Sequence, residues 1–138
     1  LFVIRVAGNI VAPSQIGSVE FAAELFGTRL VVVLGHTRCG AIQATLQALQ
    51  QYTVTQSRNQ TSIVARIQPS VEALLGTELG RDPETLMRHA IRANVRVAVD
   101  QLRHGSDVLE RLIRDDGLLV VGAEYSLESG IVDFFDGL

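Results

Sequence analysis

The sequence predicts an α/β fold, with a mostly parallel central sheet flanked by helices and a C-terminal antiparallel edge hairpin. Short aliphatic runs such as residues 30–34 show no polar alternation, which is typical of central parallel strands covered on both faces. Helical patterns separate these runs, as they do in βαβ units. A turn at residues 127–130 joins the last two runs and indicates a hairpin.

The N-terminal part is expected to form a strand, a helix and a second strand. Residues 1–6 are apolar and β-branched except for Arg5, so they read as a strand. Ser14 is a plausible N-cap for a helix over residues 16–26. Residues 30–34 supply the next strand, and the three elements together would make a right-handed βαβ unit.

The rest of the chain reads as mainly helical before the final hairpin. We expect helices near residues 41–51, 69–79, 83–103 and 106–114, a loop over 52–62, and strands at 118–123 and 131–135. Asp82 followed by Pro83 is a typical helix start. The last strand should lie antiparallel at the sheet edge. At this length we expect a single α/β domain over residues 1–138.

The composition excludes several classes of function. A net charge of −3 argues against a nucleic-acid surface, and the 12 basic residues are all arginine, which excludes a Schiff-base lysine and a GKS-type phosphate loop. Cys39 is the only cysteine, so no intrachain disulfide can form. No apolar run is long enough to span a bilayer. We expect a cytoplasmic protein that binds neither nucleic acid nor membrane.

The N-terminus has no methionine and begins inside what reads as a strand. We therefore expect this sequence to be an N-terminally truncated view of a longer chain. Any targeting segment upstream would lie outside it.

Residues 35–40, Gly-His-Thr-Arg-Cys-Gly, predict a metal site. They lie where a strand ends and a helix begins, which is where sites form in open α/β sheets. Imidazole and thiolate are both good zinc ligands, and the helix N-terminus favours the thiolate of Cys39. We predict that His36 and Cys39 are two ligands of one zinc ion. The alternative is a buried structural cysteine beside a satisfied histidine, because a zinc site needs at least three protein ligands.

Four segments resemble motifs of the β-class carbonic anhydrases, in the same order along the chain. They are Gly35-His36-Thr37-Arg38-Cys39-Gly40-Ala41 for G-H-[ST]-x-C-G-A, residues 2–9 for F-x-x-R-N-A-G-N, residues 18–22 for S-[LIV]-E-[YF]-A, and residues 120–130 for V-x-G-x-x-Y-D-x-x-T-G. Val6 and Ser126 replace the usual asparagine and aspartate. The family's first motif, C-x-D-x-R, would lie upstream of residue 1.

The resemblance implies a zinc-dependent lyase, a carbonic anhydrase that reversibly hydrates carbon dioxide to bicarbonate and a proton through zinc-bound hydroxide. It implies His36, Cys39 and an upstream cysteine as the ligands. No catalytic residue would lie within this chain, because the family's Asp–Arg pair is upstream. Gly40 and Arg5 would bind substrate. The alternative role of Arg5 is a structural salt bridge. Some members of the family have a second bicarbonate pocket, and there the resemblance would place Arg5 together with Tyr125.

The resemblance also implies a homodimer or a higher homo-oligomer. Two other functions stay open. One is a non-catalytic dimerising relative whose metal site is incomplete. The other is a thiol enzyme in which Cys39 is the nucleophile and His36 the base. His89 and His104 read as surface histidines, and Arg88, Arg92, Arg96 and Arg103 read as a solvated or partner-facing helix face.

Overall fold

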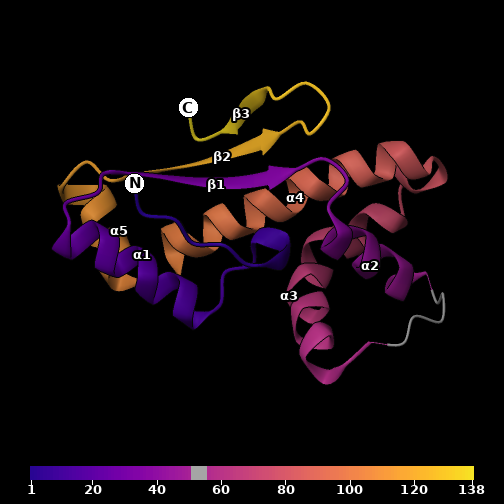
Figure 1. Cartoon of the computed structure of the whole chain (residues 1–138), viewed down its shortest axis with the longest axis horizontal. Helices are drawn as coiled ribbons and strands as arrows, with labels where there is room; N and C mark the ends of the chain where they lie inside the picture. Colours follow the sequence, from indigo (N-terminus) through magenta and orange to yellow (C-terminus); the bar gives the residue numbers. More distant parts are fainter. Residues whose placement is uncertain (51–55) are drawn as a thin grey trace.

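A computed structural model describes residues 1–50 and 56–138 of the chain. Within these residues three strands form one sheet in the order β1-β2-β3 (Figure 1), with bounds Leu30–His36, Leu119–Tyr125 and Val132–Asp136. β1 pairs with β2 in parallel, and β3 pairs with β2 in antiparallel orientation. The predicted α/β class and the antiparallel edge hairpin are therefore confirmed.

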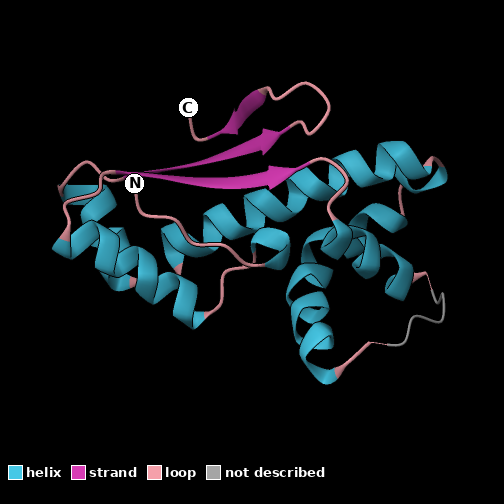
Figure 2. Cartoon of the chain, in the orientation of Figure 1, coloured by secondary structure: helices cyan, strands magenta, loops and turns pink. Residues whose placement is uncertain are grey.

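In the described part of the chain, five α-helices lie along one face and at the two ends of the sheet (Figure 2). Their bounds are Pro13–Leu25 for α1, Gly40–Leu49 for α2, Arg58–Leu75 for α3, Pro83–His104 for α4 and Asp107–Asp115 for α5. Short 3-10 turns, η1 and η2, cover Ala7–Asn9 and Glu78–Arg81. α4 runs beneath the strands, α1 packs with α5 near one end, and α2 packs with α3 near the other.

The long helix α4 is the central support of the sheet. Its start follows the predicted pattern, since the Asp82 carboxylate accepts the Thr85 backbone N–H at 3.1 Å and Pro83 takes the first helical position. Two glycines let it approach closely. A Cβ built on Gly35 would lie 2.7 Å from Val95 Cγ2, and one on Gly122 would lie 2.9 Å from Val95 Cγ1. Val95 therefore packs directly against the backbones of β1 and β2.

Among the described residues, two groups of buried apolar side chains form the core, and α4 contributes to both. The first lies under the sheet, between α4, α1 and α5, and includes Val33, Val95 and Leu109. The second lies between α2, α3 and the N-terminal half of α4, and includes Cys39 and Ile67. The connection from β1 to α2 therefore sits where the two groups meet.

Residues 1–6 do not form a strand, so the predicted βαβ unit at the N-terminus is wrong. A strand needs a partner for its backbone hydrogen bonds. Within the described residues β1 pairs only with β2, and the N-terminal segment runs as a loop below the sheet (Figure 1). The apolar, β-branched pattern indicated an extended backbone, but it carried no information on whether another strand would pair with these residues.

The prediction that the aliphatic run of β1 is covered on both faces is also wrong. β1 is the first strand in the sheet order, and only alternate side chains point towards α4. Leu30, Val32 and Leu34 are exposed at 55%, 39% and 46%. In the described part of the chain, therefore, one face of β1 is apolar and open.

Several helix boundaries differ from the prediction. α3 begins at Arg58 because Ser57 and Gln60 form a capping box, with Gln60 N–H donating to the Ser57 hydroxyl at 3.2 Å. The predicted loop is therefore helical over residues 58–62, while residues 51–55 lie outside the described part. α1 begins at Pro13 after Ala12, so Ser14 is not its N-cap. No helix in the two described stretches is long and apolar enough to cross a bilayer.

Substitutions at two glycines test the close packing of α4. Gly35→Ala should destabilise the protein by about 1–3 kcal/mol, because the added methyl group overlaps Val95. Gly17→Ala is the matched control, since Gly17 lies inside α1 and an added Cβ there meets no atom within 4 Å. It should be neutral or stabilising by up to about 1 kcal/mol. Urea unfolding measures both, and equal stabilities of the two variants would contradict the packing described.

Candidate metal centre

His36 and Cys39 lie at the two ends of one tight bend. His36 is the last residue of β1, and Cys39 is the N-cap of α2. Both line a groove of about 1010 Å³ between β1 and the N-terminal segment, and Arg5 and Tyr125 lie on its walls. The structure therefore places Arg5 and Tyr125 on the same groove as the two predicted ligands, whereas Gly40 does not line it.

The bend depends on a left-handed backbone at Arg38, whose φ is 55°. This conformation costs a non-glycine residue about 1–2 kcal/mol, so the surroundings must stabilise it. One stabilising contact is the Thr37 N–H, which donates to the Tyr125 carbonyl at 3.0 Å and continues the β1–β2 pairing. The Cys39 carbonyl accepts the Gln43 N–H at 3.0 Å and starts α2.

The ring of His36 is oriented by its neighbour. His36 Nδ1 lies 2.8 Å from the Thr37 carbonyl oxygen. A carbonyl oxygen only accepts, so this contact favours the neutral tautomer with the proton on Nδ1, in which the Nε2 lone pair is available. Histidine ligands in metal sites are commonly oriented in this way, with one ring nitrogen on a backbone carbonyl and the other on the metal.

The donor types fit zinc, but their number is one short. An imidazole nitrogen and a cysteine sulfur at one bend are suitable ligands, and zinc sites use three or four from the protein. Across residues 1–50 and 56–138 the structure contains no group of three histidine, cysteine or acidic side chains that could hold a metal. Cys39 is 4% exposed, which is also what a buried structural cysteine would show. His36 is exposed, so it does not match the alternative of a buried histidine whose hydrogen bonds are made within the core.

Glu128, which the sequence did not single out, binds the bend from the β2–β3 turn. Its Oε2 accepts the Thr37 hydroxyl at 2.9 Å, and its Oε1 lies 2.9 Å from Arg38 Nε. The hydrogen bond from Thr37 is the main cause that lowers the pKa of this carboxyl, with further contributions from its own backbone N–H, from Ser126 and from the charge of Arg38. No local pattern revealed this contact, because the partners are 91 positions apart.

A second ionic group lies behind the site, between α4 and the β2–β3 hairpin. Glu124, which is buried and paired in register with Gly35, accepts a hydrogen bond from Arg92 Nε at 2.6 Å. Arg92 also binds Asp133 at 2.7 Å and lies over the Phe135 ring at 4.7 Å.

The interpretation of the α4 arginines as a purely solvated or partner-facing face is therefore wrong for two of them. Arg92 holds the β2–β3 hairpin, as just described. Arg103 is only 26% exposed and donates to the Val120 carbonyl at 2.6 Å. Arg88 and Arg96 are exposed, as predicted, and Arg96 lies 5.0 Å from the centre of the Phe135 ring.

The remaining candidates are spread over the surface. Arg5 is exposed on the groove wall, and none of the ion pairs among the described residues involves it. Gly40 opens α2, and an added Cβ would meet nothing within 4 Å. His89 and His104 are exposed, as predicted.

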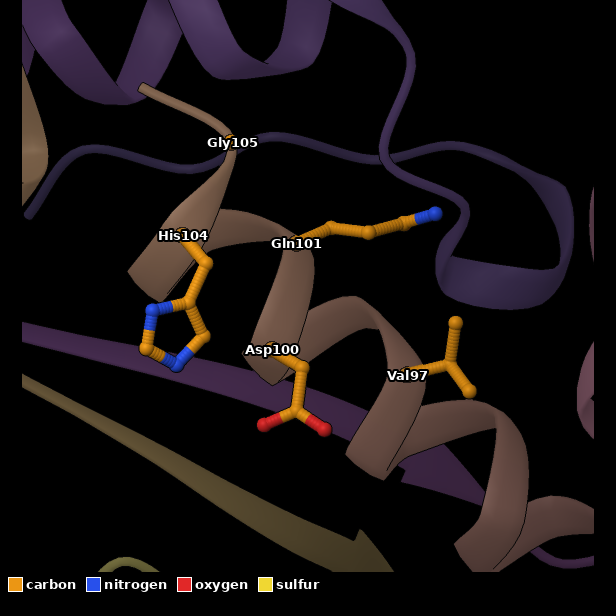
Figure 3. Close-up of a pocket in the computed structure, with 5 residues that line it drawn as sticks. All are labelled: Val97, Asp100, Gln101, His104 and Gly105. Atoms are coloured by element: carbon orange, nitrogen blue, oxygen red, sulfur yellow. The ribbon is translucent and has the colours of Figure 1, made fainter. Parts of the chain in front are cut away.

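His104 lies with Asp100 at the C-terminal end of α4, beside a separate hollow of about 360 Å³ (Figure 3). Val97 and Gln101 point away from these two side chains in the view. None of the residues that line the groove of His36 and Cys39 lines this hollow.

Comparison with known proteins gives one family. The family described as carbonic anhydrase matches residues 1–132. A carbonic anhydrase of Mycolicibacterium smegmatis is 36% identical over 135 residues, covering 96% of this chain and 62% of the relative. The chain thus spans less than two thirds of that protein.

Solved structures of β-carbonic anhydrases share the fold. CafA of Aspergillus fumigatus has a TM-score of 0.81 at 24% identity, over 98% of this chain and 63% of that one. An enzyme from Sordaria macrospora, described as tetrameric, has a TM-score of 0.81 at 21% identity, over 97% of this chain and 67% of that one.

The orientation of His36 predicts its tautomer. In metal-free protein at a pH where the ring is neutral, the proton should be on Nδ1, because the Thr37 carbonyl accepts it. Long-range ¹H–¹⁵N correlation spectra distinguish the two tautomers. His89, which is exposed, serves as the internal comparison. A protonated Nε2 on neutral His36 would show that the ring is not held as described.

Proposed function

The chain belongs to the carbonic anhydrase family, in its β class, and on that premise we propose that the protein reversibly hydrates carbon dioxide to bicarbonate and a proton. The observation that supports this most directly is the bend after β1. It places His36 and Cys39, an imidazole and a thiol, on one groove at the carboxyl end of a strand.

The proposed metal is zinc, held by His36 through Nε2 and by Cys39 through its thiolate. Residues 1–50 and 56–138 hold no third ligand beside these two, and the resemblance implies the cysteine of C-x-D-x-R for that role. The greater length of the relatives leaves room for such a segment. When bound, zinc would supply a Lewis acid that lowers the pKa of its bound water to about 7.

The residues of this chain would bind and orient the substrate. The first N–H groups of α2 have no partner within the helix, and Gly40 leaves open space beside them. They would donate to an oxygen of bicarbonate. Arg5 on the groove wall would add a charge-assisted contact to the same anion.

Two other proposals are less well supported. A non-catalytic relative with an incomplete metal site is favoured only by the lack of a third ligand among the described residues. A thiol enzyme is not favoured, because Cys39 is buried and His36 uses Nδ1 on the Thr37 carbonyl.

We also propose that the protein is a homodimer or a higher homo-oligomer. The open face of β1 carries Leu30, Val32 and Leu34, and Phe21 of α1 and Phe26 just after α1 are also exposed. Exposed apolar side chains of this size commonly mark protein interfaces where they form a patch. A cytoplasmic location is likewise proposed.

Zinc content and carbon dioxide hydration test the proposed function together. The purified protein should contain about one zinc per chain by elemental mass spectrometry and should accelerate hydration in a stopped-flow pH-indicator assay. Cys39→Ser and His36→Ala should each lose at least about 100-fold in activity, more than substitutions outside the ligand set usually cost. His89→Ala, an exposed histidine remote from the groove, is the control.

The possible outcomes separate the three functions. Protein without zinc or activity would favour the non-catalytic relative. Hydration that survives the loss of Cys39 would contradict the proposed ligand set. Rapid alkylation of Cys39 in both metal-free and zinc-loaded protein would favour the thiol enzyme, because a zinc-bound thiolate should be protected.

A further inference from the structure

The β2–β3 turn contacts both residues that separate His36 from Cys39. The Thr37 hydroxyl donates to Glu128 Oε2 at 2.9 Å and accepts the Leu127 N–H at 3.0 Å. Glu128 Oε1 lies 2.9 Å from Arg38 Nε. One carboxylate therefore binds both residues of the bend, using a different oxygen for each.

Thr37 is the centre of this arrangement. Its N–H binds the Tyr125 carbonyl at 3.0 Å, its own carbonyl binds His36 Nδ1 at 2.8 Å, and its hydroxyl binds Glu128. The orientation of the His36 ring therefore depends on how Thr37 is held. Cys39 lies on the other side of Arg38, whose backbone is left-handed.

The turn that carries Glu128 is itself ordered by local hydrogen bonds. The Ser126 hydroxyl donates to Glu128 Oε2 at 3.2 Å and accepts the Ser129 N–H at 3.2 Å. The Gly130 N–H donates to the Ser126 carbonyl at 2.8 Å. These hydrogen bonds orient Glu128 within the turn independently of its contacts with the bend. Its side chain is nevertheless 55% exposed.

We propose that Glu128 is a positioning residue for the metal centre: through Thr37 and Arg38 it holds the bend that presents His36 and Cys39 to one groove. Its role at a zinc ion rests on the proposed function. Its role in holding the bend does not, and can be measured without metal.

The reactivity of Cys39 reports the state of the bend. It is the only cysteine in the sequence and is 4% exposed, so alkylation of the metal-free chain by iodoacetamide requires local opening. Glu128→Ala and Thr37→Val should each raise the alkylation rate by about 10-fold, because each removes a link between turn and bend. Thr37→Ser keeps the hydroxyl and should remain within about twofold of the unmodified chain.

The matched control is Glu24→Ala. It removes an exposed Arg–Glu contact of the same 2.9 Å length, between Glu24 and Arg111, away from the bend. This variant should alkylate at the original rate, because Glu24 makes no contact with the bend. An original rate in both Glu128→Ala and Thr37→Val would overturn the proposal. An equal rise in Glu24→Ala would overturn it too, since general loosening would then explain the effect.

Zinc affinity is the second measurement, made by chelator competition with zinc alone. Loss of the Glu128 carboxylate should weaken binding by about 10-fold, the effect expected when a residue that orients a ligand is removed. Unchanged affinity would contradict a positioning role at the metal. Absence of zinc binding in the unmodified protein would instead refute the proposed function, while the alkylation rates would still decide whether Glu128 holds the bend.

Discussion

The contact of Val95 with the backbones of Gly35 and Gly122 sets the geometry on which the rest of the structure depends. α4 can lie this close only because neither strand carries a side chain there. Since β1 ends one residue after Gly35, the same contact determines where His36 leaves the sheet. The packing of one helix therefore fixes the position of the candidate metal ligand.

Ionic contacts from the hairpin complete this geometry. Behind the strand end, Arg92 on α4 binds buried Glu124 and so holds β2 at the level of Gly35. Beyond the strand end, Glu128 binds the bend at Thr37. The β2–β3 hairpin thus stabilises both the end of β1 and the start of α2. These contacts hold the backbone that carries His36 and Cys39 in place, so the candidate metal centre is preorganised.

The sequence predicted what depends on local pattern. Capping and apolar periodicity located α4, and the strand-to-helix position of residues 35–40 located His36 and Cys39. It failed where the outcome depends on distant partners. Residues 1–6 are extended in pattern but have no strand beside them, and Glu128 gave no signal because its contacts lie across the fold. The prediction for Arg92 was wrong because the spacing of arginines along a helix does not reveal the buried carboxylate that faces one of them, here Glu124.

The proposed function depends above all on His36 and Cys39 binding one zinc ion. Zinc K-edge X-ray absorption on the zinc-loaded protein tests it most directly, because nitrogen and sulfur ligands scatter at different distances. We expect nitrogen at about 2.0–2.1 Å and sulfur at about 2.3 Å, with less sulfur in Cys39→Ser and less imidazole scattering in His36→Ala. A shell of oxygen and nitrogen alone, or spectra that neither substitution changes, would contradict it.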